Sequence, residues 1–257
     1  MSHAQNPVIL TYHSISEGAT PLETPPQVFA EQMEWLASNA RVAPLGEIAA
    51  SVAEKKPIAE RTVTLTFDDA FQDFYTHAAP VLARLGFPAT VFVPTAYCGR
   101  TNAWPGQPSW VVKRPLMDWE QVREVAEQGF ALGAHSHTHA DLTALSAEEA
   151  GRDIAACRRE IEERTGQRAE FFCYPYGKWN ASVREQVKQS FRAACSTAAG
   201  AVEPEADPFA LPRVDAHYLR EGGWFGRMFT RSFAIYIAGR RLIRRLRGAP
   251  EGNYARV

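Results

Sequence analysis

Two short polar segments carry side chains whose types and spacing suit metal binding and proton transfer. Asp68 and Asp69 are adjacent and directly follow an apolar run, and three of the seven histidines fall within five residues: His135, His137 and His139. Two imidazoles and one carboxylate leave an open coordination position on a borderline metal such as Zn²⁺, as catalytic zinc sites require. We therefore expect a divalent-metal site. A helix N-cap at the two aspartates and a solvated histidine-rich strand edge are the alternative interpretations.

The elements that must position these segments alternate along the chain. Apolar, β-branched runs predict strands at Val8–Tyr12, Thr62–Phe67, Ala89–Val93, Phe130–Ala134, Phe171–Tyr174 and around Phe209–Val214. Helical periodicity lies between them, at Gln27–Ser38, Glu47–Ala53, Asp73–Leu85, Asp118–Gln128, Ala147–Arg164 and Ala181–Gln189. Strands that alternate with helices in this way predict parallel βαβ units in one sheet or barrel.

Functional side chains in such a fold gather where strands end and loops begin. Four predicted strands are followed by ionisable or turn-forming residues, at Tyr12-His13, Asp68-Asp69, His135 to His139 and Tyr174-Pro175-Tyr176-Gly177. We expect these four segments to meet at one site.

Composition favours one globular unit and excludes several other classes. The chain has 257 residues, 46% hydrophobic and 22% charged, which excludes a disordered, collagen-like or coiled-coil protein. A chain of this length needs no structural metal or disulfide to hold its core, so we expect a metal site to be functional. The four cysteines form no C-x-x-C pair, which excludes a zinc ribbon and favours a reducing compartment.

The two polar segments resemble motifs of a known family. Thr66-Phe67-Asp68-Asp69 resembles the first motif of the polysaccharide deacetylases, the carbohydrate esterase group that includes NodB-like chitooligosaccharide deacetylases, and His135-Ser136-x-x-His139 resembles their second motif. The resemblance covers about residues 6–219. It implies a distorted (β/α) barrel in which Asp69, His135 and His139 hold a divalent metal, with Zn²⁺ favoured, and Asp68 acts as general base. In this interpretation His137 is a bystander.

The third motif of the family is altered here. Cys173 occupies the position at which family members commonly carry an arginine that pairs with the catalytic base. Arg213 is the candidate to supply that charge from the next strand. The resemblance implies that the backbone N–H of Tyr176 contributes to an oxyanion hole, although Pro175 and Gly177 also fit a simple turn.

The usual last motif, a strand ending in histidine near the C-terminus, has no clear match. Ile9-Leu10-Thr11-Tyr12-His13 resembles that strand moved to the front of the chain, as in the biofilm poly-N-acetylglucosamine deacetylases. First and last strands are neighbours in a closed barrel, so the move keeps the site intact. We therefore favour His13 as the general acid over His217.

The resemblance implies a metal-dependent hydrolase that removes an N-acetyl group from an amino sugar in an oligo- or polysaccharide. A deacetylase or deformylase of a lipid-linked or nucleotide-linked sugar, and a catalytically impaired carbohydrate-binding protein, are the alternatives. Three aromatic residues of the segment 94–116 either stack on sugar or pack the loop on the barrel: Tyr97, Trp104 and Trp110. We expect a carbohydrate substrate and no nucleic-acid partner, and the oligomeric state stays open.

The C-terminal segment differs in charge from the rest of the chain. Residues 220–257 contain nine arginines and two glutamates, a charge of +7, in a chain whose net charge is −1. We therefore divide the chain into a catalytic barrel, residues 1–219, and a basic amphipathic helix and tail, residues 220–257. No signal peptide or span of ~18 apolar residues is evident, so we expect a cytoplasmic location.

A single helix over residues 224–247 would separate apolar from basic side chains. Its apolar face would carry Trp224, Met228, Ile235, Leu242 and Leu246, with Phe225, Tyr236 and Ile243 beside it. Its basic face, opposite, would carry Arg227, Arg231, Arg241 and Arg245. Such a helix either lies peripherally on the inner, anionic face of a membrane or docks on the barrel with a solvated arginine face.

Overall fold

Seven parallel strands close into a barrel in the part of the chain that the structure describes. The computed structural model describes residues 6–18, 20–221 and 223–246. Its strands are β1 (Val8–Tyr12), β2 (Arg41–Val42), β3 (Thr62–Phe67), β4 (Ala89–Val93), β5 (Ala131–Ala134), β6 (Phe171–Cys173), β7 (Ala193–Ala199) and β8 (Leu211–Asp215). The ring runs β1-β8-β7-β6-β5-β4-β3 and returns to β1, while the short β2 pairs with the start of β3. The predicted (β/α) barrel is confirmed.

Closure depends on the first strand of the chain. β1 pairs with β3 along its whole length, from Val8 opposite Val63 to Tyr12 opposite Phe67. On its other side β1 pairs with β8, the last strand, through Leu10 and Thr11. The N-terminal strand thus closes the ring between the last strand and β3. A strand-end residue of β1 therefore reaches the same barrel edge as the ends of β3 and β8.

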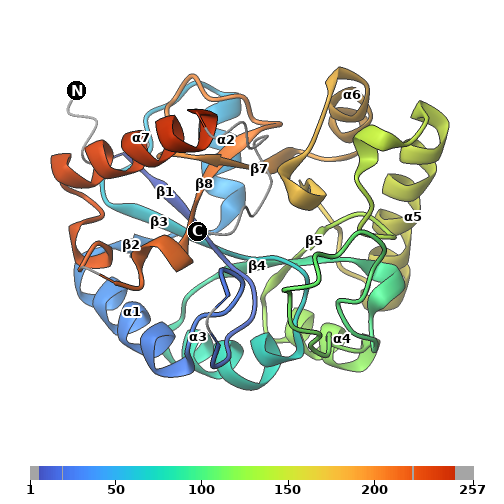
Figure 1. The fold of residues 1–257 in the computed structure, drawn as a ribbon, viewed down its shortest axis with the longest axis horizontal. Helices are drawn as coiled ribbons and strands as arrows, with labels where there is room; N and C mark the ends of the chain where they lie inside the picture. The colour runs from blue at the N-terminus through green and yellow to red at the C-terminus, as the bar shows by residue number, and fades with distance from the viewer. Residues whose placement is uncertain (1–5, 19, 222, 247–257) are drawn as a thin grey trace.

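Helices cover the outside of the ring (Figure 1). They are α1 (Pro26–Asn39), α2 (Leu45–Ala53), α3 (Ala79–Leu85), α4 (Trp119–Glu127), α5 (Ala147–Thr165), α6 (Ala181–Ser190) and α7 (Arg231–Leu246). Every residue of β1 and β3 is buried, since one side of each strand faces the barrel interior and the other side faces helices. Tyr12 stacks on Phe67 at 5.3 Å between ring centroids, and Phe29 of α1 meets Tyr12 edge-on.

Two strands and one helix differ from the sequence prediction. β2 and β7 were not predicted, because β2 has two residues and β7 consists mainly of alanine and other small residues without a β-branched run. The predicted helix Asp73–Leu85 is instead a π-helical turn, Phe74–Ala78, followed by α3. Pro80 explains the irregular turn, since its ring cannot fit a regular α-helical interior.

The C-terminal segment also differs from the predicted continuous helix. A single 3₁₀ turn at Phe225–Arg227 precedes α7, which begins at Arg231, and residue 247 lies outside the described residues. α7 packs on the barrel through the buried residues Phe233 and Ile237. Among the described residues, no helix combines the length and apolar character that a membrane span requires.

Candidate active site

Asp69, His135 and His139 lie together at the carboxyl ends of β3 and β5. Asp69 Oδ1 is 3.3 Å from His135 Nε2 and 3.1 Å from His139 Nε2, and all three side chains are buried. His135 Nδ1 donates to the Cys173 carbonyl oxygen at 2.7 Å. Because a carbonyl only accepts hydrogen bonds, this contact places a proton on Nδ1, and Nε2 is the nitrogen that faces Asp69.

His139 is held mainly by aromatic packing. The Trp104 indole stacks on the His139 ring at 3.8 Å between centroids, and Tyr176 meets the same ring edge-on at 4.9 Å. His139 Nδ1 is buried and has no hydrogen-bond partner among the described residues. Trp104 itself is only 3% exposed. Trp104 thus packs on His139, and it lines the pocket together with Trp110.

A divalent cation fits this group of atoms. The three candidate ligand atoms lie within 4.8 Å of one another, and Asp69 Oδ1 is buried without a hydrogen bond among the described residues. Burial raises the pKa of Asp69, but the nearby His139 and His135 outweigh burial and hold that pKa well below its usual range. One buried carboxylate and two imidazole nitrogens that converge in this way form the donor set of a catalytic zinc site with an open position.

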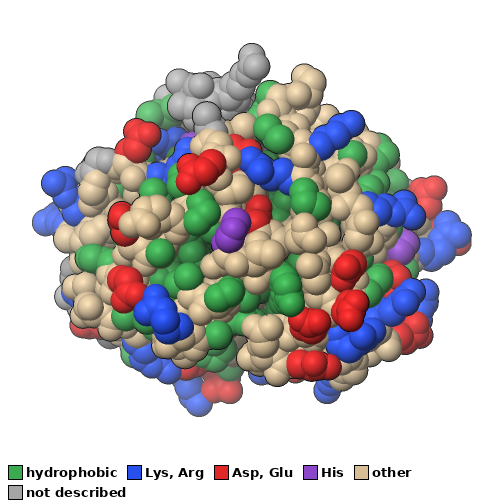
Figure 2. Space-filling model, turned by 90° about the horizontal axis from the view of Figure 1, so that it is seen from below, with side chains coloured by type: hydrophobic (Ala, Val, Ile, Leu, Met, Phe, Trp, Pro, Cys, Tyr) green, Lys and Arg blue, Asp and Glu red, His purple; other side chains and the backbone are tan. Residues whose placement is uncertain are grey.

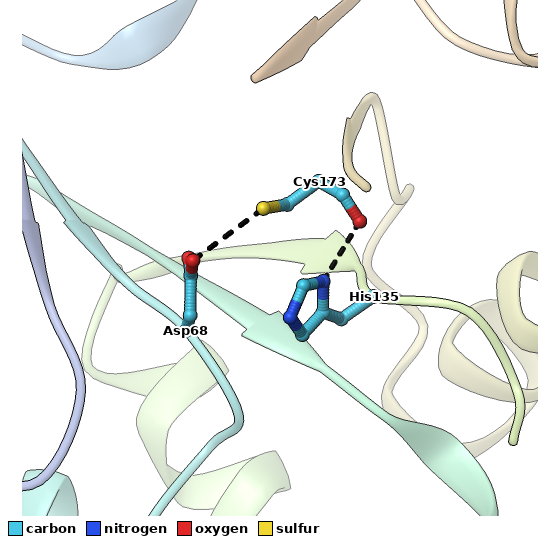
Figure 3. A group of neighbouring side chains, drawn as sticks. All are labelled: Asp68, His135 and Cys173. Carbon is cyan, nitrogen blue, oxygen red and sulfur yellow. Dashed lines mark hydrogen bonds between the residues drawn. The ribbon is translucent and has the colours of Figure 1, made fainter. Parts of the chain in front are cut away.

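Asp68, the neighbouring residue, has a different partner. Arg213 of β8 donates from Nη1 to Asp68 Oδ1 at 2.8 Å and from Nη2 to Oδ2 at 2.7 Å. The Cys173 thiol lies beside this pair, 3.5 Å from Asp68 Oδ2 (Figure 3). It is 3.1 Å from Arg213 Nη2. Burial raises the pKa of Asp68, and the Arg213 charge more than offsets that rise. The structure thus brings the predicted replacement arginine to the carboxylate.

The two candidate acid histidines occupy different environments. His13, at the end of β1, is 5% exposed, lines the pocket and has Nε2 3.9 Å from Asp68 Oδ2. His217 is not among the pocket-lining residues, and burial lowers its pKa to about 4 with added repulsion from Arg220 and Arg240. His217 is therefore neutral at ordinary pH.

Strained backbone gathers around these residues. Seven non-glycine residues of the described chain have positive φ angles, and five of them lie at the site: Asp69, Ala70, Ser136, His139 and Tyr176. Such conformations cost of order 1–3 kcal/mol each and persist where surrounding structure enforces them. Tyr176, with φ 58° and ψ 8°, occupies the second position of the one-turn 3₁₀ helix Pro175–Gly177, so its N–H has no acceptor within that turn.

The predicted site residues share one pocket. A cavity of about 250 Å³ is lined by His13, Asp68, Asp69, His135, His139 and Tyr176. Arg213 lies behind Asp68 and is 3% exposed. His137, expected to be a bystander, does not join the ligand cluster: its Nδ1 lies 2.8 Å from Thr95 Oγ1 and 3.4 Å from Glu160 Oε2.

Several residues at the site were missed by sequence reasoning. Asp153 of α5 accepts hydrogen bonds from the backbone N–H groups of His137 and Thr138, which fixes the loop between the two candidate histidine ligands. Asp215, at the end of β8, lies near His13. Burial raises the pKa of Asp215, and the charge of His13 opposes that rise. Asp215 follows an apolar strand as Asp68 does, so its place in the sequence could have predicted a site residue. No local sequence pattern predicts a role for Asp153.

The buried aspartate–histidine cluster lies at one edge of a (β/α) barrel, and comparisons with known proteins identify the family. The family model for polysaccharide deacetylase matches residues 55–191, just over half of the chain. A putative polysaccharide deacetylase of Bacillus subtilis is 29% identical over 85% of this chain and 74% of its own length. A Staphylococcus epidermidis poly-β-1,6-N-acetyl-D-glucosamine N-deacetylase is 30% identical over 73% of this chain and 66% of its own.

Solved structures share the fold. IcaB from Ammonifex degensii superimposes with a TM-score of 0.73 at 23% identity, covering 90% of this chain and 97% of that one. A Streptococcus pyogenes deacetylase in complex with acetate gives a TM-score of 0.70 at 21% identity, covering 82% and 92%. The chain belongs to the polysaccharide deacetylase family, whose members are hydrolytic enzymes.

Proposed function

We propose that this protein is a metal-dependent hydrolase that removes an N-acetyl group from an amino sugar in an oligo- or polysaccharide. The observation that carries the proposal is one pocket in which Asp69, His135 and His139 converge beside the arginine-paired Asp68. Relatives named poly-β-1,6-N-acetyl-D-glucosamine N-deacetylase support N-acetylglucosamine units as the substrate.

Hydrolysis of an amide needs a strong nucleophile, a stabilised oxyanion and a proton for the leaving nitrogen. A divalent cation held by Asp69, His135 and His139 would supply Lewis acidity, which acidifies water and polarises the acetyl carbonyl. We assign that cation as Zn²⁺ because a two-histidine, one-carboxylate set with an open position suits it.

Asp68 has the environment of a general base. Its bidentate contact with Arg213 keeps the carboxylate charged and fixes both oxygens, so Asp68 is oriented to accept a proton from the attacking water. The side chain remains at the pocket wall despite its burial. The Arg213 guanidinium, which comes from β8, therefore pairs with the catalytic base. The resemblance assigns that role to an arginine at the position of Cys173.

His13 and Tyr176 complete the reaction. His13 is near the same carboxylate and faces the pocket, so in its protonated form it can deliver a proton to the departing amine nitrogen. The Tyr176 N–H can donate to the tetrahedral oxyanion, and a single donor of this kind contributes ~3 kcal/mol. Every chemical role thus has a candidate within one cavity.

Acetate release from N-acetylglucosamine oligomers tests the function. We expect release by the metal-loaded protein, loss of release in His139→Ala, and retention in His137→Ala, whose side chain lies outside the cluster. Lipid-linked and nucleotide-linked N-acetylated and N-formylated sugars form parallel arms, and faster turnover of one of them would reassign the substrate. Carbohydrate binding without release from any substrate would instead support the impaired, carbohydrate-binding alternative.

A further inference from the structure

The outward side of α7 carries apolar side chains that are exposed. Five large hydrophobic side chains are exposed in the described part of the chain, and the three most exposed belong to α7: Ile235 at 67%, Leu242 at 59% and Ile243 at 51%. Ala238 and Gly239 are also exposed and lie between them along the helix. We call these five residues the outer α7 face. A contiguous apolar stripe on a surface helix is typical of an interaction site.

This exposure does not reflect poor docking of the helix. The opposite side of α7 buries Phe233 and Ile237, at 4% and 5% exposure. The Tyr236 hydroxyl donates to the Tyr218 carbonyl at 3.0 Å, and the Arg240 guanidinium lies 3.7 Å from the Tyr218 ring centroid. One face of α7 therefore packs on the barrel. Ile235 and Leu242 point away from it, although they were predicted for the apolar face that would either dock on the barrel or meet a membrane.

Basic residues flank the outer α7 face. Arg231 lies one turn before Ile235, and Arg241 directly precedes Leu242; both arginines are exposed. They border the apolar stripe, whereas the sequence analysis expected them opposite it. No acidic residue occurs between Glu221 and Glu251. In contrast, the face that includes α3 and α4 shows Lys and Arg side chains beside Asp and Glu (Figure 2).

We propose that the outer α7 face docks the protein peripherally on a membrane surface that contains anionic lipid. In this arrangement the apolar stripe enters the headgroup boundary while the flanking guanidinium groups contact lipid phosphates. The charge of this face favours an anionic membrane over a second copy of the chain as its partner. A two-fold contact through this face would bring the two sets of arginines together without an acidic partner from α7. The inference is independent of the chemistry in the barrel.

Co-sedimentation of the full chain with vesicles tests the proposal. We expect salt-sensitive binding to equimolar phosphatidylglycerol and phosphatidylcholine vesicles, and little binding to pure phosphatidylcholine. The double variant Ile235→Ser and Leu242→Ser should lower the partition coefficient about tenfold, and Arg231→Gln with Arg241→Gln should do the same. Val112→Ser is the control, because Val112 is 49% exposed but lies far from α7 in sequence, in the loop before α4.

Gly239 allows a gain-of-binding variant. A Cβ added at Gly239 would meet nothing within 4 Å, and the position is helical, so Gly239→Leu enlarges the stripe without disturbing the docked side. We expect severalfold tighter vesicle binding from this variant. Circular dichroism should show wild-type folding for all variants, since every substituted side chain is exposed.

Three outcomes would overturn the proposal. The first is no binding of the full chain to anionic vesicles at low salt. The second is binding that Ile235→Ser with Leu242→Ser leaves unchanged. The third is a concentration-dependent dimer that this double variant dissociates, without vesicle binding, which would identify a second copy of the chain as the occupant.

Discussion

Asp69 and Asp68 are adjacent in the chain, but their side chains have opposite electrostatic surroundings. They define two halves of the pocket, a metal half around Asp69 and a proton-transfer half around Asp68. Asp69 faces two imidazoles, and its Oδ1 accepts no hydrogen bond among the described residues. Asp68 has both oxygens hydrogen-bonded to the Arg213 guanidinium. A carboxylate with an unengaged oxygen can coordinate a cation, whereas one fixed by a guanidinium is oriented for proton transfer. The positive φ of Asp69, 71°, separates their directions at the strand end.

Cys173 joins these two halves. Its carbonyl accepts from His135 Nδ1, and its thiol contacts Asp68 (Figure 3). The thiol also contacts Arg213. Burial raises the pKa of the Cys173 thiol to about 11, so this contact adds no charge at ordinary pH. A neutral, small side chain here leaves space for Arg213 to reach Asp68 from β8. In this chain the cation that pairs with Asp68 therefore comes from β8 and not from position 173.

The largest expected effect is loss of the metal half. His135→Ala and His139→Ala should each lower metal affinity by about 100-fold or more and reduce acetate release to background, because each removes a ligand from a set of three. Metal analysis after gel filtration, together with the release assay, measures both effects. His137→Ala is the matched control and should retain metal and activity. Full occupancy in both ligand variants would contradict the assignment.

The same substitution should have different effects at the two aspartates, on kcat at one and on metal binding at the other. Asp68→Asn should lower kcat by about 10²–10⁴ and retain the metal, since it removes the base and leaves the three ligands. Asp69→Asn should instead weaken metal binding, and added metal should partly restore its activity. Titration with Zn²⁺ during the acetate assay distinguishes the two. Rescue of Asp68→Asn by metal would reverse the roles proposed for the pair.

The parts of this site that the sequence predicted are those carried by short segments at strand ends. A carboxylate pair after a buried strand, and histidines four residues apart after another, are local patterns, and parallel strands bring such ends to one edge. His13 was predicted at the same site because closure of the barrel makes the first strand a neighbour of the last. Arg213 was recognised as a candidate because the family's expected charge was missing at Cys173.

Other contributions are set by tertiary packing and leave no local pattern. Trp104 reaches His139 from a long loop, and Asp153 reaches the histidine loop from the middle of α5. β7 has one β-branched residue, Thr197, among small side chains, and an added Cβ at Gly177 would meet the Thr197 side chain. The orientation of the outer α7 face stayed open because a helical wheel identifies an apolar face without showing which side the barrel covers.

A smaller loss of activity is expected when the histidine of the proton-transfer half is replaced. His13→Ala should lower kcat by about 10²-fold or more, because general-acid catalysis is lost. His217→Ala should leave kcat within about threefold, since its side chain is outside the pocket. Both variants should keep the metal, which metal analysis checks. A larger loss in His217→Ala would show that the strand at the front of the chain does not supply the acid.

Arg213 can be compared with a surface arginine that is also paired with an aspartate. Arg213 and Arg184 each make two hydrogen bonds to one aspartate, but the Arg213–Asp68 pair is at most 5% exposed, whereas the Arg184–Asp207 pair is about one-third exposed. Arg213→Gln leaves a buried carboxylate unpaired, which costs about 3 kcal/mol and lowers Tm by about 6–10 °C. Activity should fall about tenfold. Arg184→Gln should cost under about 1 kcal/mol. Equal Tm losses in a thermal melt would show that burial of the Arg213 pair carries no energetic weight.

The smallest expected effect concerns the pH dependence of stability through His217. Its folded-state pKa is about 4 against an ordinary 6.5, because burial, Arg220 and Arg240 disfavour the charged ring, and its Nδ1 is buried without a hydrogen bond among the described residues. The unfolded chain therefore binds the extra proton between pH 6.5 and 4, so this group lowers the free energy of unfolding as pH falls through that window. The ring is partly solvated, which reduces the effect to ~1–2 kcal/mol. His217→Gln should remove this slope and raise Tm at pH 4.5 by about 2–5 °C relative to wild type, with no difference at pH 7.5. Thermal melts across that range measure it, and parallel Tm curves for the two proteins would show that His217 is not held neutral by the fold.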